Sequence, residues 1–461
     1  MMFNSTVLKG KSLPGIGILG TMVGTFLAIY LVPDNYQSQG ELQMSAIALS
    51  VGLLLAPIAA FALFRETKSL LMVQNVIMVG IVYWLLLDHA QGLQGVPGVR
   101  KDSVKLCFAL IGLFSVFTWS GTFAKPWKIP RVVHASMNVE ISEQMLFRLI
   151  IIFFVLGFSR YAIPAGFDIG VMIDALGRNR WAGPWSRGAL GGWDSFLDHM
   201  SYFGYLVPVL TVAIISKVGL RSVKVIFSIM MSIIMVMLLA QSGSRRIVGV
   251  VLAAGIIYWM INKKKIGIKL IALVTVAMLA TLTFLQKMLI VRGVGLTSVL
   301  SRNPQALDVT HFSVDDNLYR LIQMLEIFPN LHDYIYFSQI YYVLVRPIPR
   351  VFWPGKPTGP GFELAPFLGF EGLSLTSSIL GEWYAAGGIV MIVIGGWFHG
   401  RLGAMWSQLL DSDKESVLIV YSIGVLTIFA GLRSMQDLVL MSYMVIAWII
   451  VMKFYRVFQA R

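Results

Sequence analysis

The sequence predicts an all-α, polytopic integral membrane protein with about twelve transmembrane helices and two large loops on the side opposite the cytoplasm. Hydrophobic residues make up 57% of its 461 residues and charged residues only 13%, whereas a soluble domain has about 25% charged residues. The mean hydropathy is +0.76. The apolar residues also occur in continuous runs of roughly 17–25, the length of helix that crosses a bilayer core.

The apolar runs follow one another along residues 1–461 as a single transmembrane domain. Lys9 and Lys11 precede the first run, and no signal-peptide cleavage site follows it, so we expect this run to be a retained helix. The expected spans are 13–32, 44–64, 70–87, 104–124, 145–159, 199–216, 223–240, 247–262, 267–290, 382–398, 416–432 and 437–452.

Lys and Arg in the short connections predict the orientation, because cytoplasmic loops carry an excess of both. The short connections on one side are the more basic, for example around 263–265, which predicts cytoplasmic termini. Two long connections, 160–198 and 291–381, then lie outside the cytoplasm. Both contain many aromatic residues, such as Trp181 and Tyr341, which is typical of segments at the membrane interface and also of a folded cap over the helices.

Several classes of function are disfavoured by what the sequence lacks. The net charge of +14 lies largely in loops, where it fixes orientation, so we expect no nucleic-acid partner. No acidic residue lies near the middle of an expected span, which disfavours an ion-coupled transporter. The single cysteine, Cys107, excludes a Cys-based metal cluster. We find no nucleotide-binding, zinc-protease or serine-hydrolase motif.

One acidic string resembles a metal site. Asp411 and Asp413 form an Asp-x-Asp string, and two such carboxylates can share a divalent cation bound to a diphosphate. They fall in an expected cytoplasmic loop beside Lys414 and Glu415, so a solvated charge cluster explains them better. We therefore expect no metal and no other cofactor.

A group of arginines lies just outside the outward ends of the spans, where the usual charge bias would not place them. Arginine holds phosphate oxygens with a planar fork of donors and keeps its charge when partly desolvated. Each one alone is explained equally well as a surface or structural residue. Together they predict an anionic ligand at the outer bilayer surface, such as a lipid-linked diphosphate. The arginines are Arg245, Arg246, Arg292, Arg320, Arg346, Arg350 and Arg433.

Three motifs resemble those of a known family. Residues 346–357, Arg-Pro-Ile-Pro-Arg-Val-Phe-Trp-Pro-Gly-Lys-Pro, resemble the Pro/Arg-rich outer-loop signature of Wzy-type oligosaccharide repeat-unit polymerases. Residues 381–388, Gly-Glu-Trp-Tyr-Ala-Ala-Gly-Gly, are similar to their helix-start segment. Residues 242–245, Ser-Gly-Ser-Arg, are similar to a motif shared with O-antigen ligases. The layout of spans and loops is similar along the whole chain. The resemblance implies a GT-C-like glycosyltransferase architecture in the bacterial inner membrane.

The resemblance implies a reaction at the periplasmic face. A growing O-antigen or related glycan would pass from undecaprenyl diphosphate to an incoming repeat unit on the same carrier lipid. Cations would stabilise the leaving diphosphate, and a carboxylate or imidazole would accept the acceptor's proton. The expected base is Glu382, then His311, then Asp315 or Asp316. Lys356 joins Arg245, Arg346 and Arg350 as a diphosphate ligand, and Tyr384 is expected along the glycan path.

Two alternatives stay open. An O-antigen ligase would use the same donor but pass the glycan to lipid A–core, and it is expected to need a periplasmic histidine, for which His311 and His332 are available. A flippase or exporter of lipid-linked oligosaccharide would line an internal cavity with polar residues, which are scarce within the spans. The polymerase hypothesis further implies contact with the bilayer, a Wzz-like chain-length regulator and a Wzx-like flippase as partners.

Overall fold

The structure is a computed structural model in which residues 11–179, 183–185, 194–241, 245–263, 267–302, 308–346, 348, 352–357, 359–370 and 375–459 are described. These residues form helices and connecting turns, and no strand occurs among them. The expected all-α fold is therefore confirmed for this part of the chain.

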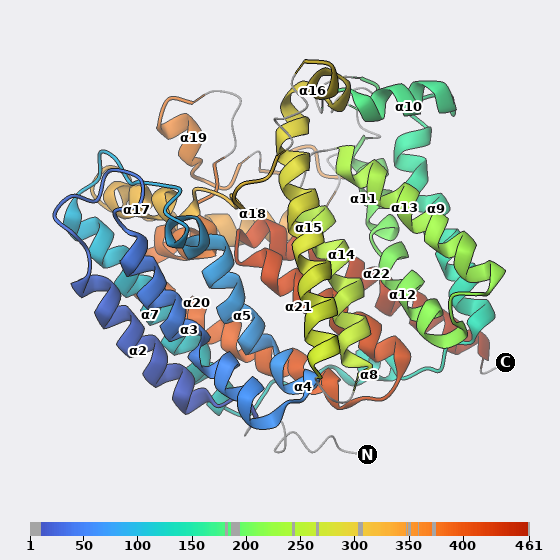
Figure 1. Cartoon of the computed structure of the whole chain (residues 1–461), viewed down its shortest axis with the longest axis horizontal. Helices are drawn as coiled ribbons and strands as arrows, with labels where there is room; N and C mark the ends of the chain where they lie inside the picture. Colours follow the sequence, from blue (N-terminus) through green and yellow to red (C-terminus); the bar gives the residue numbers. More distant parts are fainter. Residues whose placement is uncertain are drawn as a thin grey trace.

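Helices far apart in the sequence pack side by side in the bundle, as α7 (Lys101–Phe123) and α20 (Ser378–Ser407) do (Figure 1). The first part of the chain contains α2 (Pro14–Tyr30), α3 (Gln43–Phe64), α4 (Thr67–Leu70), α5 (Val73–Ile81), η1 (Val82–Leu86), α6 (Leu87–Ala90), α7 (Lys101–Phe123), α8 (Arg131–Met137), α9 (Glu143–Ala162) and α10 (Ile169–Gly177). It is followed by α11 (Asp194–Gly204), α12 (Val207–Val218), α13 (Val223–Gln241), α14 (Arg245–Ile261), α15 (Ile268–Val294), α16 (Leu296–Arg302) and α17 (Asn317–Ile327). The last part contains α18 (Ser338–Val345), α19 (Leu364–Phe367), α20 (Ser378–Ser407), η4 (Gln408–Asp411), α21 (Glu415–Gly431) and α22 (Met435–Gln459).

Many of these helices have the length and composition of membrane spans. Within the described residues, 9 helices are long and apolar enough to cross a membrane, and the shorter α2 and α21 are also apolar. Every expected span falls on one helix or on consecutive helices, as a polytopic membrane protein requires. The count of twelve spans stays a prediction.

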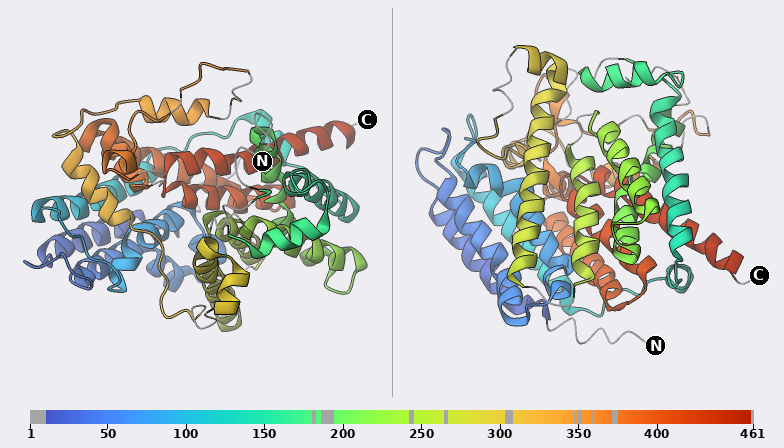
Figure 2. Two further views of the ribbon diagram at one scale, coloured as in Figure 1. Left: turned by 90° about the horizontal axis from the view of Figure 1, so that it is seen from above. Right: turned by 45° about the vertical axis from the view of Figure 1, so that its right-hand side comes forward.

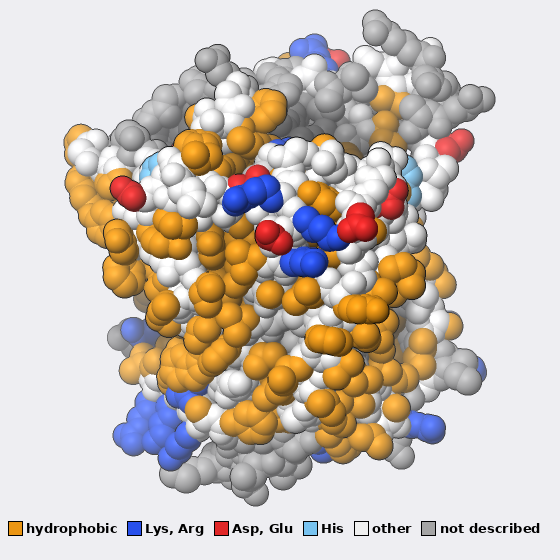
Figure 3. All heavy atoms as spheres, turned by 90° about the vertical axis from the view of Figure 1, so that its left-hand side faces the viewer, with side chains coloured by type: hydrophobic (Ala, Val, Ile, Leu, Met, Phe, Trp, Pro, Cys, Tyr) orange, Lys and Arg blue, Asp and Glu red, His pale blue; other side chains and the backbone are white. Residues whose placement is uncertain are grey.

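Apolar side chains cover the outer surface of the bundle. In the most apolar window of α15 only 17% of the residues are buried, and this helix stands at the edge of the bundle beside α14 (Figure 2). On the face drawn in Figure 3, hydrophobic side chains cover the middle, Lys and Arg gather near the lower end, and charges of both signs lie near the upper end. A contiguous apolar surface of this kind is expected where helices contact lipid.

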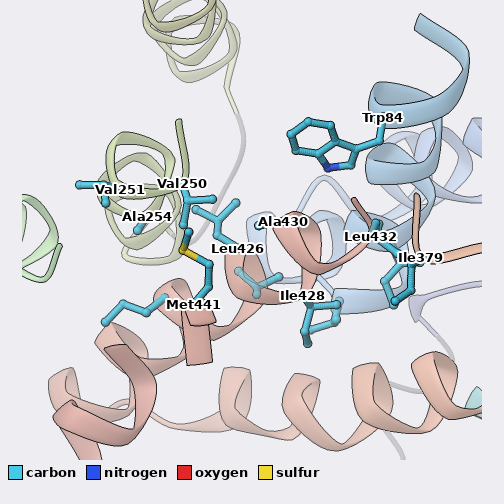
Figure 4. Packing of buried hydrophobic residues seen from close by; sticks show 14 of the residues in the cluster. Trp84, Val250, Val251, Ala254, Ile379, Leu426, Ile428, Ala430, Leu432 and Met441 are labelled. Atoms are coloured by element: carbon cyan, nitrogen blue, oxygen red, sulfur yellow. The ribbon is translucent and has the colours of Figure 1, made fainter. Parts of the chain in front are cut away.

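The centre of the bundle is built around α21. Of its 17 residues, 15 are buried, because its sequence is apolar or small on every side, as a fully enclosed helix requires. Figure 4 shows Leu426 between Val250 of α14 and Met441 of α22, with Trp84 nearer the end of α21. The Trp84 indole N–H donates to the carbonyl oxygen of Phe429 at 2.9 Å, which satisfies the one polar group of this buried ring.

The connections between helices lie at two ends of the bundle, and polar contacts join the connections at each end. Figure 1 shows α4 and α8 at the lower end and α10, α16 and α19 at the upper end. Contacts of the lower connections are Lys11 with Glu66, Thr67 with the Lys263 carbonyl, and Lys414 with Glu140. Contacts of the upper connections are Lys101 with Asp34, Arg100 with Glu326, and Gln91 with the Phe312 carbonyl.

Both long connections contain helices that the sequence analysis did not predict. The first contains α10 and the start of α11, and the second contains α16, α17, α18 and α19. In α17, Leu318, Leu321 and Leu325 are buried at helical spacing, and this helix packs on α7 and α20. The helix that contains the expected span 382–398 extends beyond it at both ends, because α20 runs from Ser378 to Ser407. The second connection is thus folded onto the bundle.

Candidate functional site

A cavity of about 820 Å³ lies at the upper end of the bundle, within the size range of about 300–1,000 Å³ usual for ligand sites. Segments far apart in the sequence form its wall, namely the first long connection, the start of α14, α18, and the starts of α20 and α22. Its charged lining residues are Arg160, Asp198, Arg246, Arg346, Glu363, Glu382 and Asp437.

Glu382 lies in the first turns of α20 and joins three helices. Its Oε2 accepts a hydrogen bond from the Met435 amide at 2.5 Å, and its Oε1 accepts one from Nε2 of Gln339 at 3.1 Å. Met435 is the first residue of α22, so the carboxylate lies at the positive end of that helix. A carboxylate has about four acceptor positions. The two protein bonds fix the Glu382 side chain and leave acceptor positions for a ligand.

A break in α20 separates the Glu382 segment from the rest of the helix. Gly387 and Gly388 have non-helical backbone angles, with φ 65° and ψ −145° at Gly388, a region that only glycine adopts readily. The carbonyl of Ala385 consequently accepts from the Ile335 amide at 2.9 Å. Tyr384 is buried beside the break and bonds to the Phe328 carbonyl at 3.5 Å. It does not line the cavity.

Asp437 lies buried between two arginines, with 1% of its side chain exposed. Nη1 of Arg246 lies 2.7 Å from each of its carboxylate oxygens. Arg433 lies 3.4 Å from Asp437 and 2.9 Å from Asp315. Burial acts to lower the pKa of Arg433, but the Asp315 and Asp437 carboxylates outweigh it, so the pKa is raised and the charge is kept. The side chain of Arg246 is 30% exposed and lines the cavity, so its guanidinium can contact a ligand while it stays paired with Asp437.

Arg346 is held at the end of α18. Its Nη1 donates to the hydroxyl of Tyr342 at 2.5 Å, and its guanidinium lies 5.6 Å from the centre of that ring, within the range of a cation–π contact. Lys356 donates from Nζ to the carbonyls of Arg346 and Ile348, at 2.9 and 2.7 Å. Lys356 thus stabilises the turn that follows Arg346 and is not among the residues that line the cavity.

The opposite wall of the cavity is aromatic and polar. Nε of Arg160 lies 2.7 Å from Oδ1 of Asp198, and Tyr202, Tyr205 and Trp185 are beside this pair in the wall. A sugar has apolar C–H faces and a rim of hydroxyl groups, which such a combination of rings and hydrogen-bonding groups matches. Sequence analysis missed this pair and Asp437. Arg160 and Asp198 lie at the two ends of the first long connection, and this position was a usable signal for the pair.

Arg245 and His311, two of the expected site residues, lie outside the cavity wall. The guanidinium of Arg245 donates to the carbonyls of Ser313 and Val314, each at 2.7 Å. His311 is exposed, with Nδ1 3.0 Å from the Thr310 hydroxyl. The contacts of both residues thus help to order the segment that precedes α17.

Asp316 and Arg320 form a separate pair on α17, at 2.5 Å. Burial raises the pKa of Asp316, although Arg320 acts to lower it. Of the expected base Glu382 and the expected diphosphate ligands, the cavity therefore brings together Glu382 and Arg346, while Arg245 and Lys356 lie outside its wall. Arg350 lies outside the described residues, and only the backbone of Arg292 is described.

Within the described ranges, no group of three or more His, Cys, Asp or Glu side chains could hold a metal ion. Asp411 and Asp413 lie beyond the far end of α20, away from the cavity. Comparison with known protein families, with curated proteins and with solved structures finds no match to this chain.

Proposed function

We propose that this chain is a metal-independent glycosyltransferase that polymerises undecaprenyl-diphosphate-linked oligosaccharide repeat units at the periplasmic face of a bacterial inner membrane. One observation carries the proposal. The Glu382 carboxylate, fixed by Met435 and Gln339, lines the same cavity as Arg246 and Arg346. A candidate base and cations for an anionic leaving group thus meet at one end of an apolar helix bundle.

The proposed reaction uses these groups as follows. A hydroxyl of the acceptor sugar attacks the anomeric carbon of the donor glycan, and the bond from that carbon to the diphosphate oxygen breaks. The hydroxyl proton passes to Glu382, and undecaprenyl diphosphate leaves with the electron pair. Arg246 and Arg346 stabilise the charge that develops on the diphosphate, as guanidinium groups do for phosphate oxygens. The wall around Arg160 would hold sugar units.

The histidines distinguish the polymerase from the ligase hypothesis. His311 is exposed, and the ring of His332 packs against Phe328 and Phe362 with centroid distances of 5.2 and 5.0 Å. Neither is among the cavity-lining residues. A transfer that requires an essential histidine therefore has less support than one that uses Glu382. A flippase would need no base at this position.

The test is turnover by purified protein in proteoliposomes that contain undecaprenyl-diphosphate-linked repeat units. Glu382→Gln keeps the size of the side chain and removes the basic charge, so we expect chain growth to fall by at least about 10²-fold. His311→Ala should keep wild-type turnover. The measurement is product length by gel electrophoresis.

Glu326→Gln is the matched control, because Glu326 also accepts a hydrogen bond from a backbone amide, that of Arg100 at 2.7 Å, but lies outside the cavity wall. It should polymerise normally. Wild-type chain lengths from Glu382→Gln would contradict the proposed base, and loss of chain growth in His311→Ala would assign the base to His311. A wild-type protein that makes no longer chains but transfers its glycan to added lipid A–core would support the ligase hypothesis.

A further inference from the structure

Helix α18 has two chemically opposite faces. Gln339, Tyr342 and Arg346 recur at helical spacing and line the cavity. Phe337 and Leu344 lie on the other side, where 67% and 65% of their surfaces are exposed. Tyr341, between them in the sequence, is 49% exposed on the same side. A helix facing water would carry polar residues at these positions.

The position of α18 places this apolar face at the border of the membrane. The helix packs on α20 and α22, and Gln339 bonds to Glu382 in the first turns of α20, which in turn bonds to the first residue of α22. Both partners are long enough to cross a membrane and begin here. In the view from above, α18 lies at the outer edge of the molecule (Figure 2, left). An amphipathic helix in this position belongs in the lipid interface.

We propose that α18 is the entry port for a lipid-linked diphosphate, with the isoprenoid tail on Phe337, Tyr341 and Leu344 and the diphosphate on Arg346. This inference rests on the proposed function for the identity of the ligand. The two faces of one short helix match the two parts of such a molecule, an apolar chain that stays in the bilayer and an anionic head that enters the cavity. Lys356 keeps Arg346 in place through two backbone carbonyls, so the head would meet a fixed cation.

The experiment measures binding of two probes to the purified full-length protein in nanodiscs, undecaprenyl diphosphate and inorganic diphosphate. Leu344→Ser should weaken binding of undecaprenyl diphosphate on the order of tenfold, because part of the contact of one leucine side chain is lost. Binding of inorganic diphosphate should not change. Arg346→Gln should weaken binding of both probes. The exposed position of Leu344 makes a folding defect unexpected.

Leu19→Ser is the matched control, since Leu19 on α2 is 63% exposed in the same type of surface, and it should bind both probes normally. Unchanged binding of undecaprenyl diphosphate by Leu344→Ser would overturn the port, as would equal weakening by Leu19→Ser. A photo-crosslinker at position 344 that captures a protein instead of the isoprenoid would also overturn it. Chain growth by the wild-type protein is measured separately. Absence of chain growth would contradict the polymerase hypothesis, whereas unchanged binding by Leu344→Ser would contradict the entry port alone.

Discussion

Arg245 and Arg246 are adjacent in the sequence but have different partners. The guanidinium of Arg245 is bonded to two backbone carbonyls before α17, whereas Arg246 pairs with Asp437 in the cavity wall. Successive residues of a helix project about 100° apart, so neighbours at a helix start reach different surroundings. One arginine therefore serves folding and the other is available to a ligand.

This division predicts opposite outcomes for the same substitution. Arg246→Lys should lower chain growth by about 10²–10³-fold, because an ammonium cannot reproduce the planar fork, while the thermal stability changes little. Arg245→Lys should cost about 1–3 kcal/mol of stability through the lost charged hydrogen bond. Thermal unfolding in detergent and product length, measured on the same preparations, separate the two effects. Equal behaviour of both variants would contradict the assignment.

The break in α20 is the feature of an element that most directly shapes the site. Because of the break, residues 378–386 form a short helical segment of their own. The Ala385 carbonyl at its end accepts a hydrogen bond from the Ile335 amide in the second long connection. Helices interrupted at membrane depth are tolerated where protein groups satisfy the freed backbone. The interruption thus holds Glu382 at the start of α22.

Gly388→Ala tests whether this backbone conformation is required. A Cβ at Gly388 would lie 2.7 Å from the Tyr334 hydroxyl oxygen, at φ +65°, so we expect a loss of about 1–3 kcal/mol of stability and impaired chain growth. Adding Tyr334→Phe removes the close oxygen but not the backbone strain, so the double variant should stay impaired. Gly15→Ala, where a Cβ meets nothing within 4 Å, should be tolerated. Full recovery of stability and chain growth in the double variant would show that the close contact with the Tyr334 hydroxyl, and not the backbone strain, caused the loss.

At the scale of the whole molecule, the two ends of the bundle differ in charge. On the face drawn in Figure 3, Lys and Arg gather near the lower end, whereas charges of both signs lie near the upper end. The cavity lies at the upper end. The charge bias of cytoplasmic loops predicts that the lower end is cytoplasmic, which would place the cavity on the periplasmic side.

Cysteine accessibility tests this orientation. Asp308 and Asp413 are both exposed aspartates, on the upper and lower connections respectively. In a Cys107→Ala background, a membrane-impermeant thiol reagent added to intact spheroplasts should modify Asp308→Cys and leave Asp413→Cys unmodified until the membrane is opened. Cys107 itself is buried. The reverse labelling pattern would put the cavity in the cytoplasm and exclude a periplasmic polymerase.

The sequence alone predicted the all-helical class and the apolar spans, because the length and composition of a run are local properties. It also singled out Arg346, as one of a group of outward arginines, and Glu382, through the motif that resembles the helix-start segment of the polymerases. The structure places both in one cavity wall. The sequence did not predict α17 and α18, whose short amphipathic patterns lie inside a long connection.

Tertiary structure decided which charged groups meet. Arg246 and Asp437 are 191 residues apart. Arg160 and Asp198 lie at the two ends of the first long connection, and the sequence does not tell how that connection folds. No spacing in the sequence therefore relates the members of either pair. The same packing assigned Arg245 to a backbone contact and Arg246 to the cavity, although the two are chemically identical. Residue type determines what chemistry is possible, but the partners of a charge depend on how helices pack, which is a property of the whole chain.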